Sequence, residues 1–98
     1  MELTSKQRTQ LRALANGIDT IVQIGKDGIG GNLIKQTEDA LEARELVKCG
    51  VLESCALSVR EGAEALGRVC RADVVQVIGS KFVLYRKKKK DAQIALPR

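Results

Sequence analysis

The residues best suited to contact a ligand form one glycine-rich cluster, Gly25-Lys26-Asp27-Gly28-Ile29-Gly30-Gly31, directly before a predicted helix. Its glycines expose backbone amides and occupy little space, and amides at the start of a helix favour a bound phosphate. A G-x-x-G loop holds nucleotide backbones in KH domains, because the missing side chains allow close approach to the sugar-phosphate. The cluster therefore suggests backbone contact with a nucleic acid, and a plain strand-to-helix turn is the alternative.

The pattern itself carries little weight. Nine glycines in 98 residues produce roughly one G-x-x-G pair by chance, and Gly28 to Gly31 is a second match. No Lys-Ser or Lys-Thr follows the cluster, and it does not spell G-x-G-x-x-G, so the sequence argues against nucleotide hydrolysis and dinucleotide binding.

Nothing else in the sequence forms a credible catalytic set. The chain has no histidine, which removes the commonest general base and the usual partner of a nucleophilic Ser or Cys. Glu38, Asp39 and Glu42 fall beside Lys35 and Arg44 on one predicted helix, where a solvated amphipathic face is the simpler interpretation than an acid–base pair. We therefore expect no enzyme, no catalytic residue and no cofactor.

The remaining composition describes a basic protein without structural metals. Cys49, Cys55 and Cys70 are odd in number and lack C-x-x-C spacing, so they are predicted to be buried thiols in a reducing cytoplasm, with no metal site. The net charge of +5 predicts an anionic partner. The run from Lys87 to Lys90 either adds phosphate contacts or is a solvated tail. No signal peptide or membrane span is expected, since no apolar run approaches roughly 20 residues.

Periodicity predicts an α/β fold with the order α-β-α-β-α-β-β. Capping boxes at Thr4-Gln7 and Ser58-Glu61 start two helices, Asn16-Gly17 supplies a left-handed stop, and Gly79 takes a positive φ in a terminal hairpin. We expect one domain over 1–98, with an ordered core over about 3–87, a basic tail over about 88–98, and one four-stranded mixed sheet in two or three layers. The predicted elements are helices 5–15, 32–44 and 59–71 and strands 20–24, 46–53, 74–78 and 82–86.

Several strings, in order along nearly the whole chain, resemble the YhbY-like proteins with a CRM domain, named for chloroplast RNA splicing and ribosome maturation. The matching segments are Leu3-Thr4-Ser5-Lys6-Gln7, Val22 to Gly28, Val74 to Gly79, Val83-Leu84-Tyr85-Arg86 and Leu96-Pro97-Arg98. The resemblance implies a fold similar to the C-terminal domain of a bacterial translation initiation factor. It also implies RNA binding without catalysis. Bacterial single-domain members of this family associate with precursors of the large ribosomal subunit, and a lone domain fits that role.

By position, Gly25, Lys26, Asp27 and Gly28 resemble the RNA-contacting loop of that family. Where relatives commonly have Ser or Thr, this chain has Gly30, so helix capping is lost or passes to Asn32. We expect a cytoplasmic monomer that binds ribosomal RNA and no membrane or small-molecule substrate, and the alternative is a module that docks on a ribosomal protein or another acidic partner. The candidate flanking contacts are Lys6, Arg8, Arg12, Lys35, Lys81 and Arg86.

Overall fold

The computed structural model describes residues 3–88 and residue 94. The second half of the lysine run and the terminal Leu96-Pro97-Arg98 lie outside the described residues. The predicted order of elements is confirmed, and none of the helices in the described part is long and apolar enough to cross a membrane. The elements are α1 (Ser5–Ala15), β1 (Thr20–Ile24), α2 (Gly31–Arg44), β2 (Leu46–Val51), α3 (Val59–Cys70), β3 (Asp73–Ile78) and β4 (Lys81–Tyr85).

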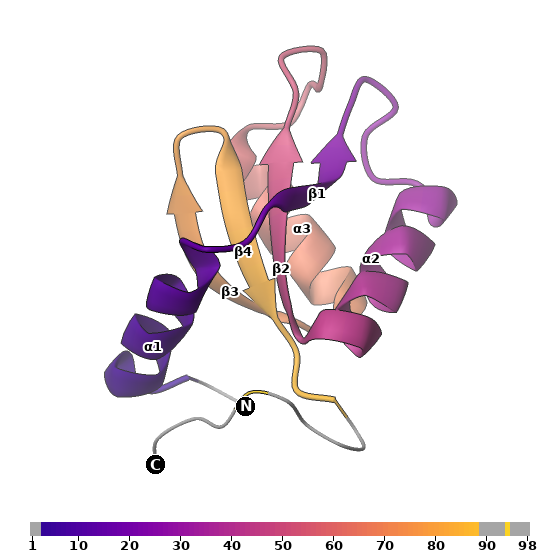
Figure 1. Ribbon diagram of the computed structural model, residues 1–98. Coiled ribbons are helices and arrows are strands. Elements are labelled where there is room, and N and C mark those ends of the chain that lie inside the picture. Colours follow the sequence, from indigo (N-terminus) through magenta and orange to yellow (C-terminus); the bar gives the residue numbers. More distant parts are fainter. Residues whose placement is uncertain (1–2, 89–93, 95–98) are drawn as a thin grey trace.

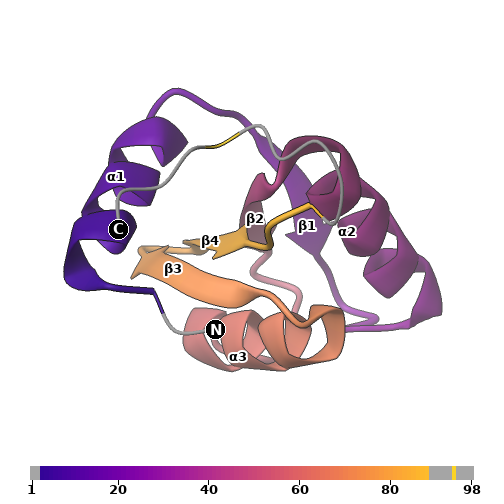
Figure 2. The same ribbon diagram turned by 90° about the horizontal axis from the view of Figure 1, so that it is seen from below.

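The four strands form one mixed sheet in the order β1-β2-β4-β3. The β1–β2 pair is parallel, whereas β4 runs antiparallel to both of its neighbours. The helix α1 covers one face, and α2 and α3 cover the other (Figures 1 and 2). The sequence left two or three layers open, and the structure has three.

Each face of the sheet has its own apolar core. Val47 and Cys49 of β2 belong to the cluster beneath α2 and α3, whereas Leu46 belongs to the cluster beneath α1. A strand that is covered on both faces buries nearly all its residues. For this reason buried and exposed residues do not alternate along β2. The predicted strand to residue 53 was too long, because β2 ends at Val51 and Leu52 is exposed.

The helix starts follow the sequence closely, but one predicted helix end was wrong. Both capping boxes are present, with the hydroxyls of Thr4 and Ser58 accepting a backbone N–H three residues on. At the end of α1, however, Asn16 has right-handed backbone angles and Gly17 does not have a positive φ. Backbone bonds three residues apart close this turn instead, for example from the Gly17 N–H to the Leu14 carbonyl at 3.2 Å.

The helix α3 contains two glycines that allow it to lie close to the sheet. A Cβ at Gly62 would lie 3.2 Å from the Ile24 side chain, and one at Gly67 would lie 3.2 Å from Val74. Glycine lowers intrinsic helix stability by about 1 kcal/mol relative to alanine. Close packing explains why that cost is tolerated here. At the hairpin, Gly79 has the predicted positive φ, +59°.

Candidate nucleic-acid interface

The glycine-rich cluster forms a tight turn at the end of β1. The Gly28 N–H donates to the Gly25 carbonyl at 3.0 Å, and Gly28 has a φ of +68°. L-residues other than Asn and Asp rarely adopt such angles, so the turn itself favours glycine at position 28. Lys26 and Asp27 form the exposed tip of the turn.

At the other glycines of the cluster, the fold has room for a side chain. A Cβ at Gly30 or Gly31 would meet no atom within 4 Å, and one at Gly25 would make only an ordinary contact, 3.7 Å from Leu52. The space that these missing side chains leave faces outward. A ligand can therefore approach the backbone there more closely than at an ordinary residue.

The N-terminus of α2 has no side-chain cap, unlike those of α1 and α3. Gly30 occupies the N-cap position, and the first turn contains no acidic residue. Within the described residues, Asn32 makes no capping hydrogen bond either. A hollow of about 330 Å³ lies against this terminus and the loop, and its lining residues are Gln23, Gly25, Lys26, Asp27, Gly28, Gly30, Gly31, Asn32 and Leu33. Uncapped helix amides beside a lysine suit an anion such as phosphate.

Two of the predicted flanking residues lie at the same end of the fold as the loop. In Figure 1 the β1–α2 loop, the start of α2 and the β3–β4 turn lie at the same end of the sheet. Lys81 begins β4 directly after that turn, and Lys35 lies near the start of α2. Lys35 makes only an exposed contact of 3.4 Å with Asp39, which leaves it available to a ligand.

Three other predicted residues belong to α1, which covers the face of the sheet away from α2. Lys6 and Arg12 are exposed, and Arg12 contacts the Thr9 hydroxyl at 3.3 Å. Arg8 instead donates through Nη1 to the carbonyl of Val74 at 2.6 Å and that of Val75 at 3.2 Å. These bonds join α1 to β3, so the geometry gives Arg8 a structural role in place of the predicted RNA contact.

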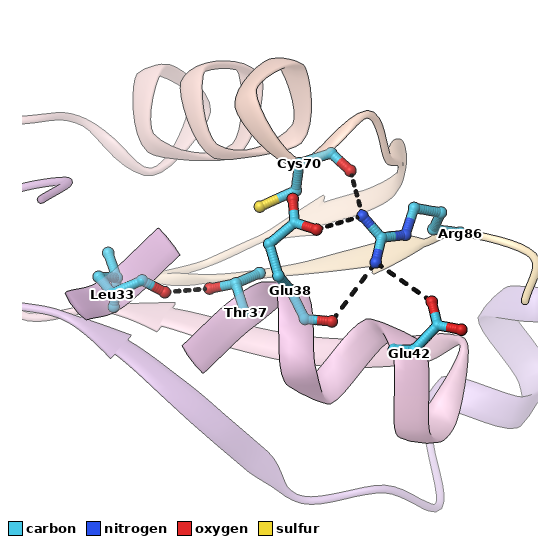
Figure 3. A network of polar contacts seen from close by, with 6 residues as sticks. All are labelled: Leu33, Thr37, Glu38, Glu42, Cys70 and Arg86. Atoms are coloured by element: carbon cyan, nitrogen blue, oxygen red, sulfur yellow. Dashed lines mark hydrogen bonds and ion pairs between the residues drawn. The ribbon is translucent and has the colours of Figure 1, made fainter. Parts of the chain in front are cut away.

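Arg86 is likewise engaged inside the protein (Figure 3). It follows the last residue of β4, at the end of the sheet away from the loop (Figure 1). Its Nη1 donates to Glu38 Oε2 at 2.7 Å and to the Cys70 carbonyl at 2.8 Å, and its Nη2 lies 3.6 Å from Glu42. The side chain is only 22% exposed. The arginine joins α2 to the end of α3, so the geometry does not favour its predicted RNA contact. It also shows that Glu38 and Glu42 are paired and not simply solvated.

The cysteines are mostly core residues. Cys49 and Cys70 are fully buried, and burial raises their pKa to about 12 and about 11. The prediction of buried thiols was wrong for Cys55, which is half-buried and accepts the Leu57 N–H at 3.4 Å. Among the residues that the structure describes, no three His, Cys, Asp or Glu side chains lie close enough together to hold a metal ion.

Two further residues near the loop were not predicted from the sequence. Gln23 lines the hollow, and Gly50 lies opposite it on β2. Polar Gln23 lies between the apolar Val22 and Ile24, and this alternation could have indicated that its side chain is exposed. The role of Gly50 depends on strand pairing, which the sequence alone does not give.

The fold and the loop together define a class: a three-layer α/β domain that presents an uncapped helix terminus and a glycine turn at one end of its sheet. Within that class the chain belongs to the CRS1 / YhbY (CRM) domain family, whose model matches residues 3–86. The resemblance inferred from the sequence is confirmed.

Individual relatives align over nearly their full length. The chain is 46% identical over 95 residues to a Bacillus subtilis protein named "Probable RNA-binding protein YqeI", covering 97% of this chain and 99% of that one. It is 33% identical over 96 residues to a Haemophilus influenzae protein named "RNA-binding protein", covering 98% and 96%. The solution structure of the hypothetical protein SAV1595 from Staphylococcus aureus has a TM-score of 0.81 and 50% identity, covering 98% of this chain and 100% of that chain.

Proposed function

We propose that this chain is an RNA-binding protein that holds RNA backbone at the loop from Gly25 to Gly28. The hollow between that loop and the uncapped start of α2 carries the proposal. In it Lys26 pairs with a phosphate, and the amides of the first helical turn donate to the same anion or to the next one along the chain. The names of the relatives, which describe RNA-binding proteins, support RNA as the ligand.

The proposed surface extends from the loop to the nearby lysines. Lys35 and Lys81 remain in it because they are exposed at the same end of the fold. Lys6 and Arg12 would form a separate patch on α1. Arg8 and Arg86 are left out of the proposed surface because their guanidinium groups already donate within the protein.

The biological setting that we propose follows from the family resemblance. A single domain of this family would act as a cytoplasmic monomer during ribosome assembly, binding ribosomal RNA in precursors of the large subunit. No catalytic step is proposed. Backbone contacts through a glycine loop suit a protein that recognises RNA shape and position more than base sequence.

The proposal predicts that Lys26→Ala weakens binding to a large-subunit ribosomal RNA fragment transcribed in vitro, with no protein partner present. One lost phosphate contact should lower the slope of log affinity against log salt by about 0.7 to 0.9. Arg68→Ala is the matched control, because it removes one exposed positive charge from α3. Equal slopes for Lys26→Ala and the unchanged protein would remove Lys26 from the site.

The same experiment separates RNA binding from docking on a protein. If the unchanged chain fails to bind the RNA fragment even at low salt, the proposal is wrong and an acidic protein partner becomes the better explanation. Binding that weakens steeply with salt, and less steeply for Lys26→Ala, supports direct RNA contact.

A further inference from the structure

A row of four side-by-side residues crosses the whole sheet at the end nearest the loop. Strand pairing places Gln23 of β1 opposite Gly50 of β2, Gly50 opposite Lys81 of β4, and Lys81 opposite Ile78 of β3. Because paired residues point to the same face, all four positions belong to one face. We call Gln23, Gly50, Lys81 and Ile78 the sheet row.

Three of the four residues of the sheet row are open to solvent, whereas Gly50 is buried beneath Gln23 and Lys81. The row lies on the face that α1 covers only in part. Gln23 and Lys81 are exposed, and Ile78 is 62% exposed. In Figure 1, α1 lies beside the other end of this face. Within the part of the chain that the structure describes, no hydrogen bond or ion pair engages the Gln23 carboxamide or the Lys81 ammonium.

Gly50 explains how these two groups reach the centre of the row. A Cβ at this position would lie 3.2 Å from Gln23 Oε1 and 3.7 Å from Lys81 Nζ. The missing side chain therefore lets a neutral carboxamide and an ammonium lie together over the middle strand. A larger residue would push both away from the sheet.

The row is continuous with the loop site, because Gln23 also lines the hollow beside Lys26. Its charge has one sign. The row contains Lys81 and no carboxylate. The next pair of β1 and β2 on the same face, Thr20 opposite Lys48, adds a second lysine and no carboxylate. The positive charge alone would attract a nucleic acid or an acidic peptide. The carboxamide of Gln23 and the exposed aliphatic side chain of Ile78 favour a nucleic acid, because they can contact a base.

We propose that the sheet row binds unpaired nucleotides of the same RNA strand that the loop holds. This inference rests on the proposed function. The Gln23 carboxamide hydrogen-bonds to a base edge, Lys81 pairs with the adjoining phosphate, and Ile78 packs against a base. The base must be unpaired, because Ile78 can pack only against a base face that is not stacked inside a duplex. Sequence-specific recognition of RNA likewise targets mostly unpaired nucleotides. Gln23 thus supplies base preference, which the backbone contacts of the loop lack.

The test titrates the isotope-labelled full chain with a single-stranded RNA decamer and, separately, with a blunt-ended RNA duplex of ten base pairs, while NMR follows the backbone amides. The single strand should shift the amides of the sheet row together with those of residues 25 to 28. The duplex should shift mainly the amides of residues 25 to 28. If the single strand moves the loop signals but not those of the row, the inference is overturned and the proposed function stands; if neither set moves, both fail.

Two substitutions test the assigned roles. Gln23→Ala should weaken binding of the single strand by about 3- to 10-fold, the loss expected for one hydrogen bond, without changing the salt slope. Gly50→Ala should have a similar effect, because its Cβ displaces the flexible end of Gln23. Gln36→Ala, on α2 at the other face, is the control. Unchanged affinity in both Gln23→Ala and Gly50→Ala would overturn the role of the row.

Discussion

Replacing Arg86 by alanine should destabilise the protein without weakening RNA binding. The change removes a charged hydrogen bond of 2.7 Å to Glu38 and one of 2.8 Å to the Cys70 carbonyl. Hydrogen bonds to charged groups contribute about 1.5 to 3 kcal/mol each, and water can replace part of this because Glu38 is 39% exposed. We therefore expect a loss of about 2 to 3 kcal/mol.

Thermal unfolding and RNA titration measure the two halves of this prediction. In a domain of this size 1 kcal/mol corresponds to about 4 to 8 °C, so the melting temperature should fall by about 10 to 20 °C. Arg86→Lys should lose about half as much free energy, roughly 1 kcal/mol, because one ammonium cannot reach all the acceptors of the guanidinium. Arg68→Ala, an exposed charge on α3, should change stability by less than about 0.5 kcal/mol.

The opposite result would restore the prediction made from the sequence. If Arg86→Ala melts within a few degrees of the unchanged protein but binds RNA more weakly, with a reduced salt slope, Arg86 contacts RNA and its bonds to Glu38 and Cys70 contribute little. RNA binding must be measured well below the melting temperature of the variant, so that unfolding is not mistaken for lost contact.

Three further predictions concern other parts of the molecule. Stability to urea should fall as the pH rises from about 9 to about 12, because the thiols ionise first in the unfolded chain, while burial in the folded protein keeps Cys49 and Cys70 protonated. Each thiol lowers the free energy of unfolding by up to about 1.4 kcal/mol per pH unit. A variant with alanine at both positions that shows the same pH slope would contradict this prediction. Glu45→Gln should cost about 1 to 3 kcal/mol in urea unfolding, because the buried carboxylate accepts two backbone N–H groups and the amide cannot accept both; unchanged stability would refute this. Gly30→Ser should raise the free energy of unfolding by a few tenths of a kcal/mol, because the serine hydroxyl can cap α2. The melting temperature should rise slightly, and a fall would show that the loop conformation is incompatible with a serine cap.

Local features were predictable because their physical causes lie within a few residues. Capping boxes join residues three apart, and Gly79 could be assigned its positive φ from the short hairpin turn alone. The turn at Gly28 also has a local cause, although its positive φ was not predicted. These patterns gave the order of elements and the position of the loop.

Long-range features were not predictable in this way. Arg8 bonds to a carbonyl 66 residues away, and Arg86 to a carboxylate 48 residues away, so neither partner is visible in local sequence. The sheet row depends on the register of four strands, which brings Gln23 and Gly50 together. The sequence therefore could not separate the basic residues that hold the fold from those that remain available to a ligand.

Arg8 and Arg86 differ in chemistry from the lysines near the loop. The planar guanidinium groups of Arg8 and Arg86 donate to several acceptors at once, which suits joints between secondary-structure elements. Within the described residues, the ammonium groups of Lys26, Lys48 and Lys81 have no partner. Lysine is a flexible point charge, so a surface built from it attracts phosphate strongly but reads little sequence. Base preference must then come from uncharged groups beside the lysines, and this is why Gln23 is the more informative residue to substitute.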